Sequence, residues 1–118
     1  MLKEYSGLLS LHSYGEADGI LFLSSIGGPL AEELEWMHRK NVTVRYWVTD
    51  KQSTKEEAKE AFIHTLCGKA DVNFGAKYSE ITGYLWTDEE LNVGGHSLIN
   101  RLKSEVGKWV HLEIEVAQ

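Results

Sequence analysis

The residues that could carry out catalysis are few and lie far apart in the chain. Cys67 is the only cysteine, and His64 precedes it by three positions. On a helix, this spacing would place both side chains on one face, where an imidazole could activate a thiol. The same spacing also fits a histidine near a helix C-terminus beside an inert thiol, and the pair supplies only two metal ligands. We therefore assign no catalytic residue, no metal site and no cofactor from the sequence.

A second group combines two aromatic residues with acids and an imidazole: Tyr84, Trp86, Asp88, Glu90 and His96. In one loop, these carboxylates and the imidazole could perform general acid-base chemistry or bind a divalent ion. The acids also fit the first turn of a short helix, where they would only interact favourably with the helix dipole. A small-ligand-binding protein or enzyme with a cleft around these five residues is thus the alternative functional hypothesis.

The sequence Gly27-Gly28-Pro29 is a third candidate, because a glycine-rich loop before a helix can expose backbone N–H groups to an anion. Glu32 and Glu33 follow directly and would repel an anion, and the chain contains no complete phosphate-binding motif. A tight connection between two elements explains the glycines as well.

The strongest pattern lies in two alternating segments, 42–49 and 109–116, that predict strands with one apolar and one polar face. Arg45 and Trp47 share the polar face of the first segment, and Trp109, His111 and Glu113 share that of the second. If the two strands are neighbours, these side chains meet across the sheet. Exposed tryptophan and arginine are typical of protein interfaces, although such cross-strand pairs can also serve only to stabilise the sheet.

Two further apolar residues fall outside the predicted core. Trp36 lies off the stripe formed by Leu30, Leu34 and Met37, and Ile63 lies across its predicted helix from the core side. Together the expected interaction surface consists of Trp36, Arg45, Trp47, Ile63, Trp109, His111 and Glu113.

Three helices are predicted to position these residues. The first runs from Pro29 to about Asn41, the second from a capping box at Ser53 to Gly68, and the third from Gly94-Gly95 to Gly107. Two strands in 4–25, two in 71–87 and the alternating segments complete the order ββαβαββαβ. We therefore expect a single α+β domain over residues 1–118, with a mixed, largely antiparallel sheet and its helices on one face.

Composition narrows the possible partners. The chain has 118 residues, a formal charge of -6 and no basic cluster, which argues against nucleic-acid binding. Its apolar runs are too short for a signal core or a membrane span, so we expect no membrane partner. A single cysteine excludes an internal disulfide and fits a reducing cytoplasm.

Several motifs resemble small uncharacterised bacterial proteins, including those carried in integron gene cassettes. They are Val44 to Asp50, Gly83 to Glu90, Gly94-Gly95-His96 and Leu102-Lys103-Ser104 before Gly107-Lys108-Trp109. The resemblance implies a bacterial, cytosolic origin on a mobile element, and it transfers no activity and no catalytic residue.

The leading hypothesis is therefore a non-enzymatic interaction module that binds itself, as a homodimer, or another protein through its exposed aromatic surface. A small molecule is the partner in the alternative hypothesis.

Overall fold

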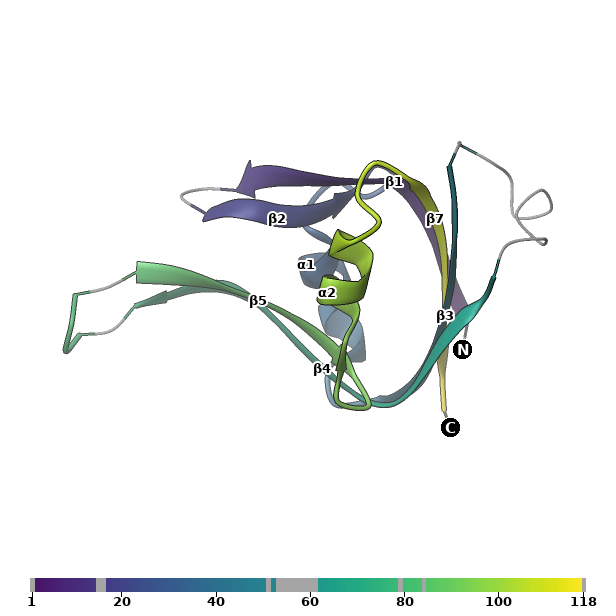
Figure 1. The fold of residues 1–118 in the computed structure, drawn as a ribbon. Coiled ribbons are helices and arrows are strands. Elements are labelled where there is room, and N and C mark those ends of the chain that lie inside the picture. The colour runs from purple at the N-terminus through teal and green to yellow at the C-terminus, as the bar shows by residue number, and fades with distance from the viewer. Residues whose placement is uncertain are drawn as a thin grey trace.

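The structure is a computed structural model that describes residues 2–14, 17–50, 52, 62–78, 80–83 and 85–117. The described residues form one seven-stranded sheet in the order β2-β1-β7-β3-β4-β5-β6, in which every neighbouring pair is antiparallel (Figure 1). The strands are β1 (Leu2–Tyr14), β2 (Ala17–Leu23), β3 (Asn41–Thr49), β4 (His64–Tyr78), β5 (Leu85–Val93), β6 (His96–Ser97) and β7 (Trp109–Val116).

Two long strands change partners partway along their length and so bend the sheet. Residues 2–8 of β1 pair with β7 and residues 9–14 pair with β2. Likewise, residues 64–69 of β4 pair with β3 and residues 70–78 pair with β5. The result is a central section, formed by β7, β3 and the first halves of β1 and β4, which carries two arms. Figure 1 shows the β1–β2 arm and the β4–β5 arm projecting from the same side of this section.

The bend in β4 depends on two glycines that approach each other closely. Gly68 has φ +140°, and a Cβ atom on it would lie 2.7 Å from the Cα atom of Gly94. Gly94 has φ +58°, and a Cβ atom on it would collide with the carbonyl oxygen of Cys67. Positive φ and close backbone contact both favour glycine. These two residues therefore allow the β5–β6 turn to pack against the corner of β4.

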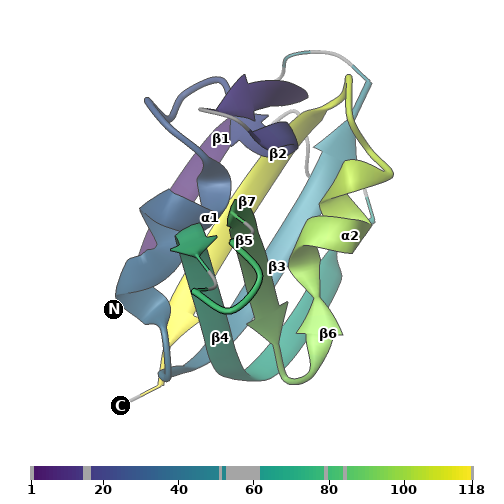
Figure 2. The same cartoon turned by 90° about the vertical axis from the view of Figure 1, so that its left-hand side faces the viewer.

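Two short helical segments fill the space between the arms. Helix α1 (Leu30–Glu33) continues into the 3₁₀ helix η1 (Leu34–Met37), and α2 (Leu98–Lys103) begins at Ser97, whose hydroxyl accepts a hydrogen bond from Asn100 N at 3.1 Å. Figure 2 shows α1 and α2 on either side of the β4–β5 arm. The core lies between these helices and the concave side of the sheet. It includes Leu9, Leu21, Leu23, Leu30, Leu34, Met37, Val44, Leu91, Leu98, Leu102, Leu112 and Ile114.

The predicted α+β arrangement with three helices, ββαβαββαβ, is wrong. The second predicted helix ends in residues 64–68, which are part of β4, and its first part, 53–61, lies outside the described residues. Apolar residues in a short segment fit a helical stripe and a buried strand almost equally well, and pairing with β3 decides for the strand. The other two helices are shorter than predicted, since the first ends at Met37 and the third at Lys103.

Neither the α-helices nor the 3₁₀ helix of the described residues has the length and apolar character needed to cross a membrane.

Candidate functional site

The candidate site is the outer face of the central section, the side of β1, β7, β3 and β4 that faces away from α1 and α2 (Figure 1). Residues directly opposite each other on neighbouring strands share a face, so the register defines which side chains line it. From β1 to β3, its four rows are Leu8, Trp109 and Thr49; Ser6, His111 and Trp47; Glu4, Glu113 and Arg45; and Leu2, Glu115 and Thr43. The outer face thus has an aromatic end and a charged end.

The aromatic end is more buried than the sequence led us to expect. Trp47 is only 5% exposed and His111 only 6%, whereas Trp109 is half-buried. The rings of Trp47 and His111 stack with their centroids 5.7 Å apart and their planes 15° apart. Trp47 and His111 thus form a shielded cross-strand pair, and the exposed part of the outer face lies around them.

The indole N–H groups at this end are unusual. The Nε1 atoms of Trp47 and Trp109 are both shielded from solvent, and neither has a hydrogen-bond partner among the residues that the structure describes. A buried N–H group without an acceptor costs about 1–3 kcal/mol, because it has lost its hydrogen bond to water.

The charged end carries a surface ion-pair cluster. Arg45 Nη2 lies 2.9 Å from Glu115 Oε2, and Arg45 Nη1 lies 3.8 Å from Glu113 Oε2. Because the Arg45 side chain is 36% exposed, each pair contributes about 0–1 kcal/mol to stability. The cluster therefore matters more for the charge pattern of the face than for folding.

The two remaining residues of the expected interaction surface lie in different places. Ile63 precedes β4 by one residue and is 49% exposed, and the register that pairs Tyr46 with His64 places it beside Trp47. Trp36 belongs to η1 and packs against the core on the concave side of the sheet, so it does not join the outer face.

Trp36 instead forms its own small cluster. Its Nε1 donates a hydrogen bond to the Tyr5 hydroxyl at 3.1 Å, and the ammonium groups of Lys3 and Lys40 lie 4.9 and 5.9 Å from its ring centroid. Burial is the main cause that raises the pKa of Tyr5, and Glu33 adds to it, whereas the hydrogen bond from Trp36 lowers it.

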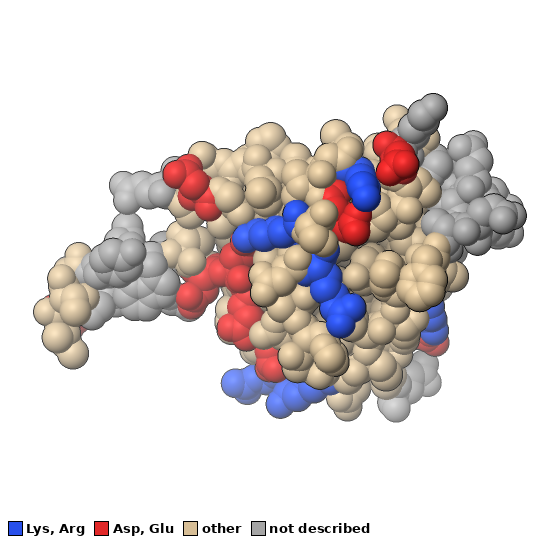
Figure 3. All heavy atoms as spheres, viewed as in Figure 1, with Lys and Arg blue, Asp and Glu red and all other residues tan. Residues whose placement is uncertain are grey.

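The alternative ligand site is spread along one arm. Tyr84 lies outside the described residues, and Trp86, Asp88 and Glu90 belong to β5. His96 pairs with Val93, three residues beyond Glu90, which is roughly 10 Å along a strand. Acidic side chains follow one another along this arm (Figure 3), but no three metal-ligating residues gather in the described part of the chain.

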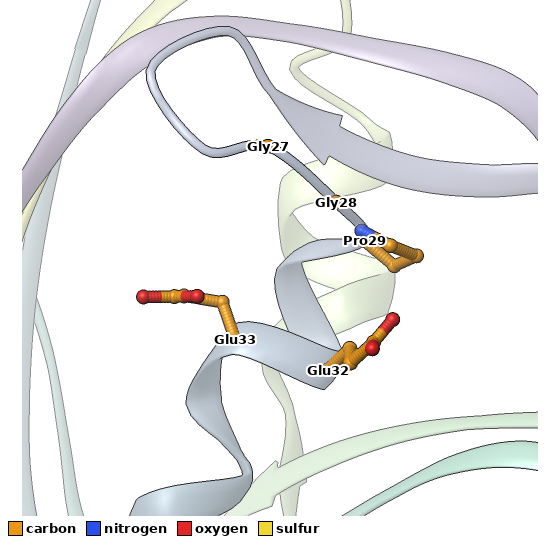
Figure 4. A pocket seen from close by; sticks show the side chains of 5 residues that line it. All are labelled: Gly27, Gly28, Pro29, Glu32 and Glu33. Carbon is orange, nitrogen blue, oxygen red and sulfur yellow. The ribbon is translucent and has the colours of Figure 1, made fainter.

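The other sequence candidates are separated as well. Cys67 pairs with Thr43 and His64 with Tyr46, so the thiol and the imidazole point to opposite faces of β4. A hollow of about 360 Å³ does lie at Gly27, Gly28 and Pro29. However, Figure 4 shows the carboxylates of Glu32 and Glu33 pointing to opposite sides of α1, so they do not converge on one ligand.

Sequence reasoning did not predict the buried position of Glu89. Its side chain is 8% exposed; Oε2 accepts a hydrogen bond from Leu21 N at 2.7 Å, and Oε1 lies 2.8 Å from Lys103 Nζ. Glu89 therefore links the edge strand β2 to α2 and the β4–β5 arm. The only sequence signal for an inward position of Glu89 is strand alternation. Glu89 stands two residues before Leu91 and four before Val93, both of which are buried.

Comparison of the chain with protein families, curated proteins and solved structures gave no match.

Proposed function

We propose that the protein is a self-associating interaction module and that a second copy docks on the outer face. The observation that carries the proposal is the set of exposed apolar side chains on that face. Leu2 is 53% exposed, Leu8 43% and Ile63 49%, on or beside strands whose opposite side forms the core. Leu8 and Ile63 flank the aromatic end on either side, and Leu2 lies at the charged end, so the face offers a partner apolar area to cover.

The register of the outer face favours a second copy over an unrelated protein. Consider a two-fold axis that runs parallel to the strands, between β7 and β3. It places β7 of one copy over β3 of the other, and Arg45 then stands opposite Glu113 in both directions. The same axis brings Leu8, on strand β1, over the β4 side of the face, one row or roughly 7 Å along the strand from Ile63. Such self-complementarity is what a two-fold dimer requires.

The size of the face predicts weak association. Four strands about 4.8 Å apart and about seven residues long cover roughly 450 Å², whereas a stable interface buries about 800 Å² on each partner. Because Trp47 and His111 are already shielded, the area that a partner can cover is smaller still. We expect a dimer that dissociates in the micromolar range or above and exchanges rapidly.

Sedimentation velocity across a concentration series tests this proposal. Leu8→Glu should abolish the dimer, because it places a charge at the edge of the apolar contact. Leu11→Glu is the matched control: Leu11 has nearly the same exposure, 42%, but lies on the part of β1 that pairs with β2 in the arm. A Leu8→Glu protein that associates as the wild type does would refute the assignment of the face.

A charge exchange tests the axis itself. Arg45→Glu alone and Glu113→Arg alone should weaken association, and the double variant should restore it, because each residue faces the other across the two-fold. If the wild type stays monomeric at every concentration, self-association is refuted, and an unrelated protein becomes the partner to seek.

A further inference from the structure

We propose that the aromatic end of the outer face also holds a small-molecule site, in which the indole N–H groups of Trp47 and Trp109 bind the carboxylate of a small apolar acid. This inference concerns the buried part of the face and does not depend on self-association.

Two hydrogen-bond donors without acceptors lie close together at the aromatic end. Both Nε1 atoms are shielded from solvent and lack partners within the described residues. The ladder pairs Trp47 with His111 and Thr49 with Trp109, so the two tryptophans are diagonal neighbours on the same face. Diagonal residues in a sheet lie within reach of each other's long side chains. One ligand with two acceptor atoms could therefore satisfy both donors.

Trp36 shows that the chain does provide an acceptor for an indole elsewhere. Its N–H group donates to Tyr5, and Trp36 is only half-buried. The more deeply buried Trp47 has greater need of such a partner, yet it has none among the described residues. Buried donors are almost always satisfied in folded proteins, so two adjacent exceptions call for an acceptor that the described residues do not supply.

The chemistry of the lining selects the class of ligand. An indole nitrogen donates and cannot accept, so the ligand must contribute acceptors only. A carboxylate has two acceptor oxygens, and hydrogen bonds to a charged acceptor are about twice as strong as neutral ones. The half-buried ring of Trp109 and the exposed side chain of Leu8, which pairs with it, suit a flat apolar body.

The charged end of the outer face lies next to the proposed site. The nearest carboxylate along β7 is Glu113, two residues beyond His111, and Arg45 lies 3.8 Å from it. Arg45 is also two residues from Trp47 on β3. The arginine thus offsets part of the repulsion that the carboxylates of Glu4, Glu113 and Glu115 on this face would exert on a bound carboxylate.

The test follows the indole N–H signals of the ¹⁵N-labelled wild-type protein by NMR during titration with benzoate, at a protein concentration at which sedimentation velocity shows only monomer. Leu8 stays in place because it pairs with Trp109 beside the proposed site, and working with the monomer keeps the result independent of dimer formation. The four tryptophans give four indole signals, assigned by single Trp→Phe variants. We expect saturable downfield shifts for Trp47 and Trp109, no shift for Trp36, and an affinity loss of roughly ten- to a hundredfold in Trp47→Phe.

Benzamide, the neutral isostere, tests the ligand class and should bind at least about tenfold more weakly, since charge-assisted hydrogen bonds are lost. Equal affinity for benzamide overturns the carboxylate assignment. No shift with benzoate up to its solubility limit overturns the site, as does a uniform shift of all four indoles. Circular dichroism of each variant checks that the protein is folded, so that a missing chemical-shift change reflects lost binding.

Discussion

Replacing Glu89 should open the contact between the two arms of the sheet. Its carboxylate is 8% exposed and accepts one hydrogen bond from the backbone of Leu21 on the edge strand β2 and one from Lys103 on α2. Glu89→Ala leaves the Leu21 N–H group buried without an acceptor, which costs about 1–3 kcal/mol. The ion pair adds only about 0–1 kcal/mol, because Lys103 is 34% exposed. We expect a total loss of roughly 1–4 kcal/mol in the free energy of unfolding.

Glu89→Gln separates the two contributions. The amide oxygen can still accept from Leu21 N, and only the charge is lost, so the expected cost is about 1 kcal/mol. Urea denaturation measures both variants, and amide exchange at Leu21 should accelerate strongly in Glu89→Ala alone. Glu90→Ala is the control, because Glu90 stands next in β5 and points to the other face. A Glu89→Ala protein as stable as Glu90→Ala, or a Gln variant as unstable as the Ala variant, would refute the proposed role of the backbone hydrogen bond.

Three further predictions concern the turns, the helix cap and the Trp36 contact. Gly94→Ala should destabilise the protein by about 2–4 kcal/mol in chemical denaturation, because its Cβ atom would collide with the backbone at positive φ. Gly95→Ala is the control and should cost only about 1 kcal/mol, because Gly95 has φ +82° but open space around it. Ser97→Ala removes the N-cap of α2 and should cost about 1 kcal/mol, measured in the same way. Trp36→Phe removes the hydrogen bond that lowers the pKa of Tyr5, so this pKa should rise further in a spectrophotometric titration; an unchanged or lower pKa would contradict the contact.

The raised pKa of Tyr5 also predicts how stability depends on pH. The folded state holds the phenolic proton more tightly than the unfolded chain, whose tyrosine titrates near pH 10. The contribution of Tyr5 is therefore fully present below pH 10 and is lost as the pH rises through the folded-state value. The difference between the denaturant midpoints of the wild type and Tyr5→Phe should stay constant below pH 10. Above pH 10 the midpoint of the wild type should fall relative to that of Tyr5→Phe.

The alternating strands were predictable from the sequence, because their pattern is local. The predicted segment 109–116 matches β7, and 42–49 differs from β3 by one residue. β4 could not be predicted in the same way. Its first half alternates His64 and Leu66 with Thr65 and Cys67, a weak contrast in polarity, and only long-range pairing with β3 and β5 settles its conformation.

The sequence predicted which side chains of the outer face are neighbours, but not how exposed each of them is. Assuming that the alternating strands are neighbours places Arg45 beside Glu113 and Trp47 beside His111, as observed. Burial of the Trp47 ring depends on its surroundings in the folded sheet, such as the stacked ring of His111, which strand periodicity does not encode. The inward position of Glu89 was not predicted because three consecutive acids suggest a uniformly solvated turn. In a strand, they alternate, and Glu89 faces inward between two outward neighbours.

The shielding of Trp47 changes which variants can test a docking surface. An indole that is 5% exposed and stacked on His111 lies within the fold, so Trp47→Ala would remove buried aromatic area and destabilise the protein by about 3–5 kcal/mol. A loss of association in that variant would then report unfolding as readily as a broken interface. Leu8 and Arg45 remain accessible while the same strands keep their core faces intact. Only substitutions at such exposed positions can therefore separate binding by the outer face from the stability of the sheet beneath it.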